Sequence, residues 1–200
     1  MARKTKTTQR NASRGAARKS GTSGRKAVPA RRPVAAAPTA KKQLLDSYAR
    51  ESQLTLKVLR AYPPGQADFR PHMRSKSARE LAYTFVIEQS LLLRALKDEL
   101  ALGSGGPPPV PTELQTIIDQ FEQGVHEVVE RVKHMPEPRL YTTIQFPTGP
   151  GEMGTWTKLA FAWFLLSDQI HHRGQYSVYL RLAGGKVPAI YGPSADEPWR

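Results

Sequence analysis

Cysteine is missing from the 200-residue sequence, which excludes disulfide bonds, zinc–thiolate sites and thiol nucleophiles. Long apolar runs are missing as well, since the longest, Leu159–Leu166, is far too short to span a bilayer. The first residues also lack the hydrophobic stretch of a secretory signal. These absences predict a cytoplasmic protein without a membrane-spanning segment.

Acidic side chains are missing from the first part of the chain. Residues 1–42 contain 13 lysines and arginines but no aspartate or glutamate, and the remaining residues contain 17 basic and 17 acidic side chains. Residues 1–40 also lack aromatic residues, leucine and isoleucine, so they cannot bury enough surface to offset the entropy of ordering. We therefore predict a disordered basic tail over residues 1–40 and a folded domain over residues 41–200.

Three roles are open for this tail. It is a solubilising extension, or an arm that binds nucleic acid or another polyanion through residues 1–42, or an organelle transit peptide. The second role needs no sequence specificity, because lysine and arginine release the counterions of phosphate groups. The third is suggested by the arginine- and serine-rich, acid-poor composition. The mixture is similar to a histone tail in composition only.

The rest of the chain shows four amphipathic segments, each long enough for a helix of a bundle. Ser77 and Glu80 have the spacing of a capping box, and so do Thr112 and Gln115. A proline- and glycine-rich connection at 136–153 is expected to contain a short strand around Leu140–Phe146. These patterns predict an all-α four-helix bundle. The expected helices cover residues 41–61, 77–101, 112–134 and 155–182.

Polar side chains interrupt the apolar faces of two of these helices. Asp168 and His172 are four residues apart, so they share one face of the last helix, and Glu88 interrupts the apolar stripe of the second. Helical bundles build metal sites from such inward carboxylates and histidines. The alternative is a metal-free arrangement, in which Asp168 accepts a hydrogen bond from His172 and Glu88 reaches water or an arginine. His171 points about 100° away from His172 and is not expected to be an equivalent ligand.

Two segments near the end of the sequence, His171–Leu182 and Gly185–Glu197, resemble the DinB family of helical-bundle proteins. A weaker similarity covers Phe69–His72 and Ser77–Ala82, and the resemblance extends over about residues 43–195. It implies a DinB-like four-helix bundle.

The resemblance also implies a metal site. Its usual ligands are three histidines, one on the second helix and a His-x-x-x-His pair on the last. These positions fall on Thr84, Asp168 and His172, and only His172 keeps the expected residue. Glu88, one turn after Thr84, is the candidate replacement for the third ligand. The altered set is rich in oxygen and would suit a divalent cation such as Mn²⁺ or Mg²⁺.

Family resemblance further implies an enzyme that uses a divalent metal to transfer a low-molecular-weight thiol to an electrophile, or to hydrolyse a small-molecule substrate. The alternative is a noncatalytic bundle that binds a ligand or a protein, with the basic tail attaching it to nucleic acid. The sequence is also compatible with a homodimer.

Overall fold

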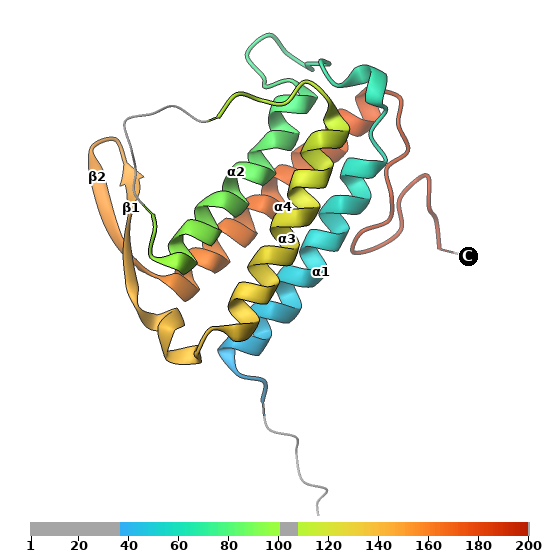
Figure 1. Cartoon of the computed structure of the whole chain (residues 1–200). Coiled ribbons are helices and arrows are strands. Elements are labelled where there is room, and N and C mark those ends of the chain that lie inside the picture. Colours follow the sequence, from blue (N-terminus) through green and yellow to red (C-terminus); the bar gives the residue numbers. More distant parts are fainter. Residues whose placement is uncertain (1–36, 101–107, 200) are drawn as a thin grey trace, which may run out of the picture. The chain divides into compact units, whose positions relative to one another are not determined.

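The computed structural model describes residues 37–100 and 108–199 (Figure 1). Residues 1–36 of the predicted disordered tail lie outside the described residues. Within the described residues four long helices form the bundle, which confirms the predicted number and order. None of the helices in the described ranges is both long and apolar enough to cross a membrane. The helices are α1 (Ala40–Arg60), α2 (Ala78–Lys97), α3 (Leu114–His134) and α4 (Lys158–Leu182).

The order of the helices around the bundle differs from their order in the chain. Both α1 and α2 pack against α3 and α4, so α1 and α2 occupy opposite corners. Lys41 at the start of α1 donates to the carbonyls of Lys133 and Met135 at the end of α3, so these helices are antiparallel. Arg131 near the end of α3 donates to the carbonyl of Leu96 near the end of α2, so these two are parallel. The neighbouring helices α2 and α4 run in opposite directions, and their middles face each other (Figure 1).

Side-chain caps define where three of the four helices of the described residues begin, namely α1, α2 and α4. The predicted capping box of α2 is confirmed, because the Ser77 hydroxyl accepts from the Glu80 amide at 3.2 Å and the Glu80 carboxylate accepts from the Ser77 amide at 2.6 Å. The second predicted capping box, at Thr112, is wrong. The N-cap of α3 is Glu113, and no side chain caps it. The strongly amphipathic face of α3 packs against α1 and α2, so this helix forms without a cap.

A β-hairpin between α3 and α4 corrects the all-α prediction. Its strands β1 (Thr143–Gly149) and β2 (Glu152–Thr157) pair in antiparallel fashion after a short 3₁₀ turn, η2 (Glu137–Tyr141). Phe146 and Trp156 point from the two strands onto Phe161 of α4, with ring centroids 4.7 and 6.3 Å away. The predicted helix start at Thr155 is therefore wrong, since this residue belongs to β2 and Thr157 caps α4.

Asp98 joins the end of α2 to the start of α4. It adopts the left-handed conformation (φ 64°) that ends α2 after Lys97, earlier than the predicted end at Ala101. Its carboxylate forms an ion pair at 2.5 Å with Lys158, the first residue of α4, whose side chain is completely buried. A second ion pair joins Asp98 to Arg139 of η2. The hairpin connection is thus tied to the bundle.

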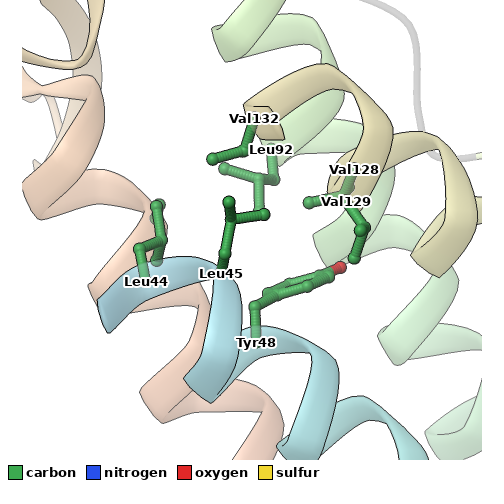
Figure 2. A pocket seen from close by; sticks show the side chains of 8 residues that line it. Leu44, Leu45, Tyr48, Leu92, Val128, Val129 and Val132 are labelled. Carbon is green, nitrogen blue, oxygen red and sulfur yellow. The ribbon is translucent and has the colours of Figure 1, made fainter. Parts of the chain in front are cut away.

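A small apolar cavity lies inside the bundle, between α1, α3, Leu92 of α2 and Ala162 of α4 (Figure 2). Its volume is only about 10 Å³ and its exposed wall is entirely apolar, so it barely holds one water and offers no polar partner. We regard it as a packing void and not as a ligand site. It is lined by Leu44, Leu45, Tyr48, Leu92, Val128, Val129, Val132 and Ala162.

Candidate metal centre

Glu88 in the middle of α2 faces Asp168 and His172 in the middle of α4. The Nδ1 atom of His172 lies 2.6 Å from Oε1 of Glu88 and 3.8 Å from Oδ1 of Asp168. One ligand atom from each of the three residues lies within 4.8 Å of the others. The antiparallel packing of α2 and α4 thus brings together the three residues singled out from the sequence. That they bind a metal stays a prediction.

The three side chains differ in exposure. The exposed fraction is 7% for Glu88, 18% for His172 and 37% for Asp168. Burial raises the pKa of Glu88 to about 7, although the hydrogen bond with His172 acts in the opposite direction. The same hydrogen bond raises the pKa of His172 against the effect of its burial. The pair therefore tends to retain a proton near neutral pH, and a bound cation would have to displace it.

The second carboxylate oxygen of Glu88, Oε2, is buried and has no hydrogen-bond partner. A buried carboxylate oxygen without a donor or a counter-charge is costly. A divalent cation between the three residues would supply that counter-charge. One imidazole nitrogen and two carboxylates form a set of donors that fits such a cation and leaves coordination positions open.

Thr84, at the position of the third family ligand, has other partners. It lies one turn before Glu88, and its hydroxyl donates to the Glu80 carbonyl at 3.2 Å and accepts from Nζ of Lys76 at 2.8 Å. Sequence reasoning missed Lys76, which precedes the capping box directly. Only the fold of the loop before α2 brings this lysine back over the helix.

His172 also lines a surface cleft of about 440 Å³. The cleft lies where the end of α4 meets the start of α2. The other lining residues are Ser75, Lys76, Leu81, Gln175, Val178 and Tyr179.

The neighbours of His172 on α4 have structural roles. His171 is exposed, and its Nε2 lies 2.8 Å from the side-chain amide nitrogen of Gln175. Arg173 is buried against α1. Its guanidinium donates to the Glu51 carboxylate at 2.8 Å and to the Glu51 carbonyl at 2.9 Å, and it also donates to the Tyr191 hydroxyl. Arg173 therefore ties α4 to α1 and to the C-terminal segment.

The arrangement of helices and the run of residues after His171 have counterparts in known proteins. The profile of the DinB family matches residues 37–199 of the chain. This protein belongs to the DinB family. A curated relative of this DinB-family protein is the uncharacterized protein YrdA of Bacillus subtilis, which is 36% identical over 95 residues. That match covers 44% of the present chain and about half, 51%, of the length of YrdA.

Solved structures of DinB-like proteins share the fold. One from Bacillus cereus superposes with a TM-score of 0.62 at 24% identity, and covers 75% of this chain and 97% of its own. Another, from Bacillus subtilis, has a TM-score of 0.57 at 18% identity. The match covers 72% of the present chain and 93% of the Bacillus subtilis chain. At these identities the likeness establishes the fold, and the chemistry of the site has to be argued from the residues themselves.

Proposed function

We propose that this DinB-family protein binds a divalent cation through Glu88, Asp168 and His172, and uses it to transfer a thiol to, or to hydrolyse, a small molecule. The observation that carries the proposal is the convergence of the three donors within 4.8 Å around a buried carboxylate oxygen that has no partner. A structural hydrogen bond between Glu88 and His172 alone would leave that oxygen unsatisfied.

Each of the three residues has a distinct task in this proposal. Glu88 supplies the buried negative charge, His172 the neutral nitrogen donor, and Asp168 a carboxylate on the solvent side. The ring of Phe85 packs edge-on against His172 at 6.4 Å and restricts the orientation of the imidazole. A divalent cation bound by these residues would lower the pKa of a coordinated thiol or water and so would supply a nucleophile near neutral pH.

The identity of the cation follows from the donors. Two carboxylates replace donors that are neutral imidazoles in the usual family site, so the present site carries more negative charge. Harder cations such as Mn²⁺ and Mg²⁺ prefer oxygen ligands of this kind. We therefore expect Mn²⁺ or Mg²⁺ to be better suited to this site than to a three-histidine one.

The decisive experiment is metal analysis of protein purified without a metal-binding tag, followed by titration with Mn²⁺, Mg²⁺ and Zn²⁺. We expect stoichiometric binding, weakened about tenfold or more in Asp168→Asn and Glu88→Gln, because each variant removes one charged ligand. Asp119→Asn on the exposed face of α3 is the matched control and should bind like the wild type. Absence of stoichiometric metal, or full binding by Asp168→Ala, contradicts the proposal.

A second candidate function is a noncatalytic, ligand-binding bundle. The observation that favours it is the short contact of 2.6 Å between His172 and Glu88, which pairs the two groups without a cation. This candidate predicts folded protein without metal, in which Glu88→Gln mainly lowers the free energy of unfolding. The metal titration separates the two candidates.

A further inference from the structure

Lys76 lies where two surface clefts meet beside the candidate metal centre. The first cleft, of about 440 Å³, contains His172. The second, of about 390 Å³, contains Arg74 and Thr84. Ser75 and Lys76 line both clefts, so a ligand in either one lies next to the same ammonium group.

The structure holds Lys76 over the groove between α2 and α4. Its ammonium donates to the Thr84 hydroxyl at 2.8 Å, one turn of α2 before Glu88. Its backbone carbonyl accepts from the hydroxyl of Tyr179 on α4 at 3.1 Å. The exposed side chain of Lys76 is thus bonded to α2 and its backbone to α4, which places the charge beside both helices.

The positive charge of Lys76 has no acidic partner among the residues that the structure describes. The ion pairs formed within residues 37–100 and 108–199 include Arg70 with Glu80, at 3.0 Å, but neither Lys76 nor Arg74. The first backbone amides of α2 already have acceptors, since Ala78 and Arg79 donate to the carbonyls of Phe69 and Ala67 and Glu80 donates to the Ser77 hydroxyl, so they are not free to bind an anion. Recognition of an anion at this end of the groove would therefore fall to the side chains.

A cation beside a metal site needs an explanation. Lys76 and His172 line the same cleft, so the electric field of the Lys76 ammonium reaches the metal centre. The same field would repel a divalent cation and weaken its binding. An anionic group lying between the ammonium and the metal would remove this repulsion and would be attracted by both.

We propose that Lys76, assisted by Arg74, binds the carboxylate or phosphate group of a small molecule that occupies these clefts and reaches the centre formed by Glu88, Asp168 and His172. The inference rests on the proposed function for the reacting end of that molecule. Beyond the proposed function, it specifies that the ligand is a small organic anion and that Lys76 selects it.

Calorimetric titration of the full chain with inorganic phosphate and with malonate, each with and without saturating Mn²⁺, tests this proposal. The variants are Lys76→Gln and the matched control Lys97→Gln, an exposed lysine at the other end of α2. Basic residues 1–42 contribute the same background in every variant. We expect Lys76→Gln to weaken binding of at least one anion about tenfold, and Lys97→Gln to leave it within about twofold. The anion that responds identifies carboxylate or phosphate.

Binding of Mn²⁺ alone is measured in the same variants. Lys76→Gln should retain or increase the affinity for Mn²⁺, because it removes a repelling charge. Equal anion affinities in Lys76→Gln and Lys97→Gln overturn the inference. If Mn²⁺ does not bind but the anion still depends on Lys76, the proposed metal function fails and the anion site stands.

Discussion

Two buried carboxylates on the bundle interior differ in how completely they are satisfied. Glu51 receives hydrogen bonds from Arg173 and Tyr191, so its charge is matched within the protein. Glu88 contacts His172 through one oxygen, and its other oxygen has no partner. A fully satisfied buried pair is typical of structural ties, whereas an orphaned buried oxygen suggests a ligand. At the scale of single residues, this difference separates the structural site from the candidate functional one.

Metal binding should depend on pH through Glu88 and His172. Both must lose their protons to act as ligands, and their pKa values are raised, that of Glu88 to about 7. The affinity for Mn²⁺ should therefore rise between about pH 6 and pH 8, by up to about tenfold per pH unit for each proton displaced. Calorimetry in buffers with different ionisation enthalpies measures the protons released. An affinity that is constant over this range would contradict the assignment.

The Glu51–Arg173 pair should contribute to stability. Arg173→Met leaves a buried carboxylate without its partner and should lower the free energy of unfolding by about 3–5 kcal/mol. Arg60→Met, which breaks an exposed ion pair with Glu122, is the control and should cost at most about 1 kcal/mol. Urea denaturation measures both. Similar losses in the two variants would show that burial of Arg173 is unimportant.

The same pair predicts acid sensitivity. Burial alone would raise the pKa of Glu51, but the hydrogen bonds from Tyr191 and Arg173 bring it below the ordinary value of 4.5. The pair therefore contributes its full stability above pH 4.5, and this contribution is lost as the pH falls toward the lower pKa of the folded state. The difference in stability between wild type and Glu51→Gln should shrink below that pH. A difference independent of pH would argue against the lowered pKa.

At the scale of elements, apolar periodicity predicts the helices well and the hairpin poorly. The sequence indicates a strand around Phe146, but it assigns the end of the partner strand to the following helix. The reason is that Trp156, near the end of β2, is separated from the apolar run Leu159–Leu166 of α4 by only two polar residues. Alternation over only a few residues, interrupted by Gly149, Gly151 and Gly154, is too short to distinguish from a loop. The pairing of β1 with β2 determines that this segment forms a hairpin.

Replacing either of two helical glycines by alanine should change the free energy of unfolding, and the two changes should have opposite signs. A Cβ added to Gly174 of α4 would meet no atom within 4 Å, although a close helix contact is the usual reason for a glycine inside a helix. Gly174→Ala should therefore raise the free energy of unfolding by about 0.5–1 kcal/mol. A Cβ on Gly124 of α3 would lie 2.3 Å from Oε1 of the buried Gln89, so Gly124→Ala should lower it. Urea denaturation measures the free energy of unfolding of both variants. A lower value for Gly174→Ala than for the wild type would contradict the conclusion that a Cβ fits at this position.

At the scale of the whole molecule, charge is divided unevenly along the chain. Residues 1–36 carry 11 basic and no acidic side chains, whereas residues 37–200 carry 19 basic and 17 acidic ones. The compact unit Ala37–Arg200 contains the whole bundle, and α1 begins with its own cap, since the Thr39 hydroxyl accepts from the Lys42 amide. The folded unit therefore has the caps and contacts it needs within itself.

If the basic tail is a polyanion-binding arm, deleting residues 1–36 should abolish salt-sensitive binding to DNA and leave the thermal unfolding midpoint unchanged. Loss of the basic residues removes the release of counterions, and the nearly neutral remainder offers no comparable attraction. Titration of labelled duplex DNA at several salt concentrations measures the effect. Unchanged binding by the shortened chain would move the DNA site into the bundle.

The sequence by itself determined the four helices, the family and the candidate ligands Glu88, Asp168 and His172. These features depend on local spacing, because a helix places residues four apart on one face whatever it packs against. Tertiary structure decided that Glu88 meets His172, that Arg173 is buried, and that Lys76 lies over the groove. These depend on which helices are neighbours and in which direction they run. The burial of apolar faces sets that arrangement across the whole bundle, beyond the reach of any local pattern.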